Sequence, residues 1–238
     1  MRIRGLLLLA SFALVHAPAS SLAGQATIPP AENPHPLISG RQILAASLIL
    51  TMTLMGDQGL RGEIQEHRGN TTNSVAGVGN ALGDPRYLLP ALGAGYLVGQ
   101  LVGDEGLSRV VLHAGGAALL AGGITTVVKF AVGRSRPGQT DDADVFQPFS
   151  GRNSFPSGHT TLAFAVATAI ADETEDGWSD VLLYGIASAT AFARLNNDRH
   201  WTSDVLAGAL VGHLSARWLS RRSGLRAGPG TIGITLQF

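Results

Sequence analysis

The sequence predicts an all-α protein, a helical bundle of about six core helices. Apolar segments rich in Ala, Leu and Gly recur along the chain, and they lack the strict alternation that half-buried strands show. Gly and Pro residues separate these segments, as they do between helices. The 238 residues are enough for one domain with a full hydrophobic core.

The first 23 residues have the layout of a secretory signal peptide. A basic start, with Arg2 and Arg4, precedes the apolar stretch 6–15, and small residues follow it. This stretch is short for a membrane span of ~20 residues, so we favour a cleaved signal ending near Ala23 over an uncut anchor. Residues 24–37 contain four prolines and are expected to form a linker, which places the helical domain at 38–222.

Within that domain the polar and apolar segments locate the helices. The segment 56–82 is polar and is expected to form a short surface helix and a loop. The last residues, 231–238, alternate apolar and polar side chains, which predicts a strand in a C-terminal tail, 223–238, that is mobile or packs on the bundle. The core helices are expected at 43–55, 88–102, 110–128, 160–171, 181–193 and 205–219.

The composition excludes several classes of function. The formal charge is zero, so no polyanion-binding surface is indicated and nucleic acid is not expected as a partner. There is no cysteine, which excludes disulfides, thiolate catalysis and zinc–thiolate sites. Hydrophobic residues make up 45% and charged residues 14%, which is apolar for a soluble protein and dilute for a polytopic membrane protein.

Three polar clusters interrupt the second half of the chain. The first joins Lys129, the only lysine, to Arg136-Pro137 with six residues between them. Two cations at one junction of helix and loop supply part of a phosphate-binding cradle, although a solvated helix end would look the same. Arg134 lies in this neighbourhood outside the spacing, and we interpret it as a loop or supporting residue.

The second cluster is Pro156-Ser157-Gly158-His159, directly before an apolar helix. A proline, a capping serine and a glycine at a helix start present free N–H groups, which form an anion site. His159 in the first turn is then placed to act as a general acid. A capping serine beside an incidental histidine is the alternative.

The third cluster contains Arg194, His200 and Asp204. His200 and Asp204 are four residues apart at the start of the last helix, so both side chains are expected on one face of it. The carboxylate can then orient the imidazole, whose other nitrogen is free to attack an electrophile. A surface His–Asp pair is the alternative.

The remaining histidines and acids have structural interpretations. His113 and His213 lie inside apolar helices and are expected to be packed polar residues. Three acids, Asp141, Asp142 and Asp144, are expected to form a solvated loop, since no His or Glu joins them to make a metal site. We therefore predict neither a metal site nor a cofactor.

Taken in order, the three clusters resemble the three motifs of the type 2 phosphatidic acid phosphatase / vanadium haloperoxidase superfamily. The likeness covers about residues 88–219. One departure is Ala193, which stands where the third motif usually has a serine before its arginine.

The resemblance implies a metal-independent phosphatase acting on a phosphomonoester or diphosphate. It implies His200 as a nucleophile that becomes a phosphohistidine, with Asp204 orienting it and His159 as the acid. The residues implied to hold the phosphate are Lys129, Arg136, Ser157, Gly158 and Arg194. Alternatives are a vanadium haloperoxidase, although those enzymes are generally larger, a non-catalytic phosphate- or lipid-binding protein, and a structural exported protein.

The substrate and location follow only in outline. The apolar composition favours a phosphorylated lipid as the substrate, with a membrane surface or bilayer nearby. Because two of the expected helical segments are only 12 and 13 residues long, we favour a soluble or peripheral periplasmic bundle. An integral inner-membrane protein with an outward-facing site is the alternative.

Overall fold

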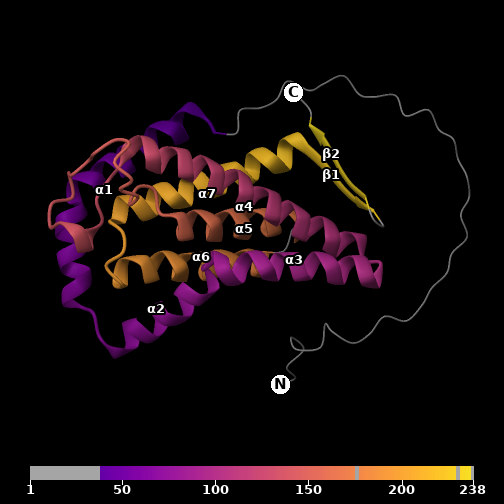
Figure 1. Ribbon diagram of the computed structural model, residues 1–238, viewed down its shortest axis with the longest axis horizontal. Coiled ribbons are helices and arrows are strands. Elements are labelled where there is room, and N and C mark those ends of the chain that lie inside the picture. Colours follow the sequence, from indigo (N-terminus) through magenta and orange to yellow (C-terminus); the bar gives the residue numbers. More distant parts are fainter. Residues whose placement is uncertain (1–37, 175–176, 229–230, 237–238) are drawn as a thin grey trace, which may run out of the picture. The chain divides into compact units, whose positions relative to one another are not determined.

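Helices dominate the computed structural model, which describes residues 38–174, 177–228 and 231–236 (Figure 1). The predicted all-α fold is confirmed, and a short 3₁₀ turn, η1 (Pro137–Gln139), lies in the long loop between the fourth and fifth helices. Within the described residues the helices are α1 (Gly40–Glu66), α2 (Asn70–Leu82), α3 (Pro85–Val102), α4 (Glu105–Val132), α5 (Gly158–Thr174), α6 (Gly177–Asn196) and α7 (Thr202–Arg222).

The helices are longer than their apolar segments because local caps set their ends. Asp84 caps α3 by accepting a hydrogen bond from the Arg86 amide, and Pro85 fills the first helical position. Gly133 ends α4 in the left-handed conformation, with φ 58°, which glycine adopts without strain. The helices therefore extend beyond the predicted apolar segments and include polar residues in their first and last turns.

The expectation of a short surface helix and a loop at 56–82 is wrong. α1 continues to Glu66, and α2 occupies most of the remainder. Asp57 and Arg61 lie within α1 and face the rest of the protein, because Asp57 is fully buried and Arg61 contacts Asp198. Polar residues here mark a contact between α1 and the body of the protein, not the end of the helix.

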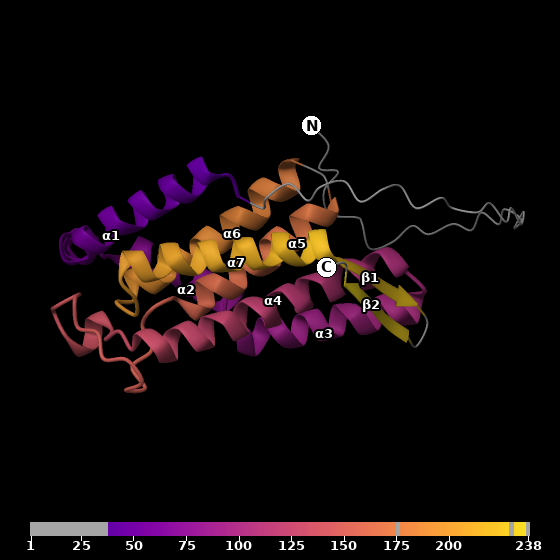
Figure 2. The same ribbon diagram turned by 90° about the horizontal axis from the view of Figure 1, so that it is seen from above.

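The tightest packing joins α4, α5 and α7, which run side by side (Figures 1 and 2). Their shared core consists mainly of alanines, including Ala117, Ala165 and Ala216. Gly208 of α7 is part of this contact, since a Cβ there would lie 2.6 Å from the carbonyl oxygen of Ser157. The small residues let α7 cross close to the start of α5, which brings the second and third polar clusters together.

Two antiparallel strands, β1 (Ser223–Gly228) and β2 (Thr231–Leu236), follow α7, and β1 contacts α4. The alternating segment at the end of the chain is β2. β1 was not predicted, because its sequence SGLRAG has two glycines and no apolar alternation. The expected signal peptide and linker at 1–37 lie outside the described residues.

Large apolar side chains remain exposed on several helices. In the part of the chain that the structure describes, α1 and α4 are long and apolar enough to cross a membrane, judged by length and composition. On α1, Met52 and Met55 are 73% and 85% exposed. α5 and α6 contain 17 and 20 residues once their polar turns are included, so they are longer than the 12 and 13 residues expected from the sequence.

Candidate active site

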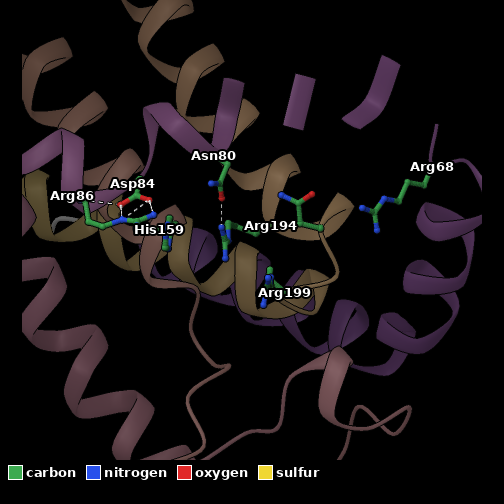
Figure 3. Close-up of a pocket in the computed structure, with 8 residues that line it drawn as sticks. Arg68, Asn80, Asp84, Arg86, His159, Arg194 and Arg199 are labelled. Atoms are coloured by element: carbon green, nitrogen blue, oxygen red, sulfur yellow. Dashed lines mark hydrogen bonds and ion pairs between the residues drawn. The ribbon is translucent and has the colours of Figure 1, made fainter. Parts of the chain in front are cut away.

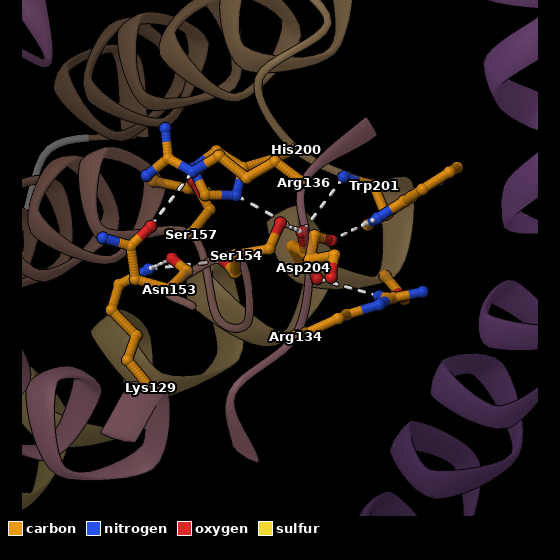
Figure 4. Close-up of polar contacts among 12 residues, drawn as sticks. Lys129, Arg134, Arg136, Asn153, Ser154, Ser157, His200, Trp201 and Asp204 are labelled. Atoms are coloured by element: carbon orange, nitrogen blue, oxygen red, sulfur yellow. Dashed lines mark hydrogen bonds and ion pairs between the residues drawn. The ribbon is translucent and has the colours of Figure 1, made fainter. Parts of the chain in front are cut away.

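The three polar clusters meet at one end of the bundle (Figure 4). Lys129 lies in the last turn of α4, and Arg194 lies in the last turn of α6. His159 is in the first turn of α5, and Asp204 is in the first turn of α7. Antiparallel packing of α4 with α5, and of α6 with α7, thus brings residues far apart in sequence to one place.

His200 and Asp204 form a buried pair. The Nδ1 atom of His200 lies 3.3 Å from Oδ2 of Asp204, and both side chains are almost fully buried. The expectation that both residues share a helix is wrong for His200, because α7 begins at Thr202. The turn before the helix still brings them into contact, so the spacing of four residues identifies the pair although its conformational reason differs.

Asp204 is held by more than the histidine. Its Oδ2 accepts hydrogen bonds from the Trp201 amide (3.0 Å) and from the Ser154 hydroxyl (2.5 Å). Its Oδ1 accepts one from the Arg134 guanidinium (2.8 Å). With its orientation fixed from several sides, the carboxylate fixes the orientation of the imidazole in turn.

Behind Asp204 lies a second buried carboxylate, Asp57 of α1. Its Oδ2 accepts from Arg134 at 2.8 Å, and its Oδ1 accepts from the Ser203 amide at 2.9 Å. Neither Asp57 nor Arg134 has any exposed surface. Sequence reasoning assigned no role to Asp57 and only a supporting one to Arg134, because Asp57 lies in the segment 56–82, where polar residues were expected.

Three cations surround the pair. Lys129 donates to the backbone carbonyls of Asn153 and Ser154, and Arg136 donates to the side chain of Asn153. Lys129 thus binds the backbone of Ser154, whose hydroxyl donates to Asp204. The charges of Lys129 and Arg136 both act on the His200 imidazole. The third cation, Arg194, is 7% exposed, and its Nε has no partner within the described chain. An unpaired buried guanidinium N–H is what an anion would satisfy.

The serine and glycine of the second cluster differ in what they can offer an anion. The amide of Ser157 is not free, because it donates to the backbone carbonyl of Asp204 at 2.8 Å. Its hydroxyl accepts from Thr160 at 3.0 Å. Gly158 opens α5 beside Lys129, whose Cε would lie 3.7 Å from a Cβ at that position. The Gly158 amide at the helix start is therefore the better placed donor for an anion.

His159 lies in a pocket beside the Asp84–Arg86 ion pair and Arg194 (Figure 3). Burial, followed by the charge of Arg194, lowers the pKa of His159 to about 4. Burial also lowers the pKa of His200 to about 4, although the hydrogen bond and charge of Asp204 oppose that shift. Both imidazoles are therefore neutral at pH 7 while the site is empty.

The pKa of the Asp204 carboxylate is lowered as well, for a different reason. Burial raises the pKa of Asp204, but the hydrogen bond and charge of His200, together with the charge of Arg134, outweigh it and hold the pKa below its usual value. Asp204 is ionised at neutral pH, as a residue that orients an imidazole must be.

The residues with structural interpretations lie elsewhere. His113 contacts Glu173, and His213 contacts Thr168 and Tyr184, all within the helical body. Asp141 is exposed and pairs with Arg61. Among the described residues no group of three or more His, Cys, Asp or Glu side chains is arranged to hold a metal ion.

The helix ends of this bundle bring together a His–Asp pair, a second histidine and several cations, an arrangement suited to binding an anion. Comparison with known families makes the kind of protein specific: the PAP2 superfamily matches residues 110–226, which contain all three clusters. Residues 110–226 thus match the superfamily that the resemblance of the motifs predicted.

Individual relatives agree with this assignment. Over 116 residues the chain is 41% identical to a lipid A 1-phosphatase of Porphyromonas gingivalis, which covers 47% of this chain and 24% of that protein. The chain thus matches about a quarter of the length of that relative.

Two solved structures share the fold. The crystal structure of Aquifex aeolicus LpxE has a TM-score of 0.52 at 20% identity, covering 69% of this chain and 94% of that one. The transmembrane PAP2 type phosphatidylglycerolphosphate phosphatase of Bacillus subtilis has a TM-score of 0.56 at 18% identity, covering 75% and 94%. At these identities the likeness establishes the fold.

Proposed function

We propose that this protein is a phosphatase that hydrolyses a phosphate ester of a lipid through a phosphohistidine. The observation that carries the proposal is the buried His200–Asp204 pair in one site with Lys129, Arg136 and Arg194. A site for phosphate binding alone needs the cations, but it has no use for an imidazole held by a carboxylate. The lipid A 1-phosphatase relative supports a lipid as the substrate class.

The reaction has two steps. In the first, Nε2 of His200 attacks phosphorus, the bond from phosphorus to the leaving oxygen breaks, and His159 protonates that oxygen. In the second, His159 takes a proton from water, the water oxygen attacks phosphorus, and the P–N bond breaks to release phosphate and free His200. Lys129, Arg136, Arg194 and the Gly158 amide stabilise the charge on the phosphoryl oxygens in both steps.

His159 needs the bound substrate in order to act as an acid. In the empty site burial and Arg194 hold its pKa at about 4, so it carries no proton at neutral pH. A phosphate dianion bound between them offsets the positive charge of Arg194 and raises the pKa of the imidazole. Substrate binding therefore supplies the protonation state that the first step requires.

Replacing His159 with alanine should slow the enzyme in a way that depends on the leaving group. We expect kcat for an alkyl phosphate to fall by ~10²–10⁴-fold, because an alkoxide leaves poorly without a proton. The loss for 4-nitrophenyl phosphate should be much smaller, since that leaving group is stable as an anion. Comparison of the two substrates in the wild type and the variant is the measurement, and an equal loss on both would contradict the acid role.

The same two histidines predict an acidic pH optimum. Protonation of His200 below its pKa of about 4 removes the lone pair that attacks phosphorus. Raising the pH removes the proton of His159, whose pKa is also low. Because bound substrate raises the pKa of His159, we expect kcat to be greatest between about pH 4 and pH 6, and the alkaline decline to disappear in His159→Ala. An optimum above neutrality would be inconsistent with this assignment.

Catalysis can be tested directly against the haloperoxidase alternative. Purified protein given 4-nitrophenyl phosphate should release phosphate, vanadate should inhibit the release by occupying the cradle, and a chelator should leave it unchanged. Vanadate-dependent bromination without phosphate release would favour the haloperoxidase. Vanadate binding without either activity would favour a binding protein.

We also propose that the protein resides in a membrane, with α1 and α4 inserted. The apolar side chains that α1 and α4 expose, among them Met52, Met55, Leu119 and Val127, would be unfavourable in water. Both helices pass the length and composition test for spans. This revises the preference for a soluble or peripheral periplasmic bundle, while export and an outward-facing site remain part of the proposal. Carbonate washing should leave the protein in the membrane pellet, and release by carbonate would exclude insertion.

A further inference from the structure

The pocket that His159 and Arg194 line is more cationic than one phosphate requires. It has a volume of about 400 Å³ and is lined by four arginines, Arg68, Arg86, Arg194 and Arg199 (Figure 3). Among the described residues that line it, only Asp84 is acidic. His159 also lines it, so the pocket lies on the side of the site from which the leaving group departs.

Two of the four arginines already have a role. Arg86 forms an ion pair with Asp84, with Nη2 and Oδ2 2.6 Å apart, which neutralises both. Arg194 belongs to the cradle for the phosphate under attack. That cradle, with Lys129 and Arg136, already balances a dianionic phosphate, which leaves Arg68 and Arg199 as surplus charge.

Arg68 is held in position by its neighbours. Its Nε donates to Oδ1 of Asn73 at 2.9 Å, and the same oxygen accepts a hydrogen bond from Asn196 at the end of α6. Gln65 donates to the carbonyl of Leu195, which fixes the turn between α1 and α2 against the end of α6. In the described structure the terminal nitrogens of Arg68 make no hydrogen bond or ion pair.

Arg199 reaches the pocket from the other side. It directly precedes His200, and its side chain is exposed and has no hydrogen bond or ion pair with any described residue. Its charge acts on both Arg136 and Arg194, so the three cations repel one another while the site is empty. An anion in the pocket would relieve that repulsion and accept hydrogen bonds from the guanidinium groups of Arg68 and Arg199.

We infer that Arg68 and Arg199 form a second anion subsite, which binds a phosphate carried by the leaving group of the substrate. The preferred substrate is then a lipid with a second phosphate close to the one that is removed. That second phosphate is either the inner phosphate of a diphosphate ester or a phosphate on a neighbouring hydroxyl. The inference rests on the proposed function, since it takes His159 to mark the leaving-group side.

The first test compares substrates that differ only in the second phosphate. Farnesyl monophosphate and farnesyl diphosphate are given to the wild type, Arg68→Gln and Arg199→Gln, with Arg41→Gln as a control for the loss of one charge. Arg41 is exposed in the first turn of α1 and does not line the pocket. We expect Arg68→Gln to lower kcat/KM for the diphosphate about tenfold or more and to change that for the monophosphate less than about threefold.

A further substrate separates the two sources of the anion. The substrate is a glycerolipid with phosphates on separate, neighbouring hydroxyls. If the subsite accepts a phosphate on a neighbouring hydroxyl, Arg68→Gln should lower kcat/KM for this lipid as it does for the diphosphate. If the subsite accepts only the inner phosphate of a diphosphate ester, Arg68→Gln should lower kcat/KM for the diphosphate alone. Equal losses on mono- and diphosphate substrates, or none on either, would overturn the subsite.

A binding measurement separates failure of this inference from failure of the proposed function. His200→Ala, which lacks the nucleophile, is titrated calorimetrically with orthophosphate and with pyrophosphate. Pyrophosphate should bind about tenfold more tightly or better, and adding Arg68→Gln should remove that advantage. The same affinity for the two anions would refute the subsite even if the enzyme is an active phosphatase. An advantage that depends on Arg68 would uphold the subsite even in a protein without activity.

Discussion

His200→Ala should abolish phosphate release, lowering kcat by at least ~10⁴-fold, as removal of a covalent nucleophile does in other enzymes. Its Nδ1 is engaged by Asp204 and its burial keeps it neutral, so Nε2 is available for attack. Initial rates on 4-nitrophenyl phosphate measure the loss. His67→Ala is the matched control, because His67 is an exposed histidine outside the site and its loss should leave the rate unchanged.

The covalent intermediate gives an independent readout. Wild-type enzyme mixed with ³²P-labelled substrate and denatured in alkali, where a phosphohistidine persists, should carry label on the peptide that contains His200. The His200→Ala protein should carry none. Turnover by His200→Ala, together with absence of label from the wild type, would show that water attacks the substrate directly and that His200 has another role.

The helical fold and most of the candidate site could be predicted because they depend on local signals. Apolar segments identified α3 to α7, and the positions of Lys129, His159 and Arg194 at helix ends follow from where those segments stop. The spacing of His200 and Asp204 predicted their contact although His200 precedes the helix. Each of these predictions depends on a pattern within one short stretch of the sequence.

The contacts that were not predicted join residues distant in the chain. The bond between Asp57 and Arg134 spans 77 residues, and no local pattern relates an acid in α1 to a loop after α4. Free N–H groups were expected at the start of α5, but the close crossing of α5 and α7 engages the Ser157 amide with the carbonyl of Asp204. β1 was missed because its glycine-containing sequence acquires strand structure by pairing with β2.

Asp57→Ala should impair both stability and catalysis, although Asp57 does not contact the substrate cradle. The side chain has no exposed surface and binds Arg134 and both the amide and the hydroxyl of Ser203. Its removal leaves a buried guanidinium paired with Asp204 alone and an unpaired amide at the start of α7. Breaking a buried ion pair on one side costs about 3–5 kcal/mol, a large part of the stability of a domain. Thermal unfolding of the purified protein measures this loss.

Catalysis tests whether Asp57 acts through Asp204. With only one acid left to hold it, Arg134 should draw Asp204 away from His200, so kcat should fall about tenfold or more while KM changes little. Asp141→Ala is the control, since Asp141 is exposed and also pairs with an arginine, and its loss should cost no more than about 1 kcal/mol. Asp57→Asn, which retains the shape and can still accept from the Ser203 amide, should recover part of the stability but less of the rate. If Asp57→Ala lowers stability and leaves kcat intact below its unfolding temperature, the α1 carboxylate supports the fold and has no part in positioning the nucleophile.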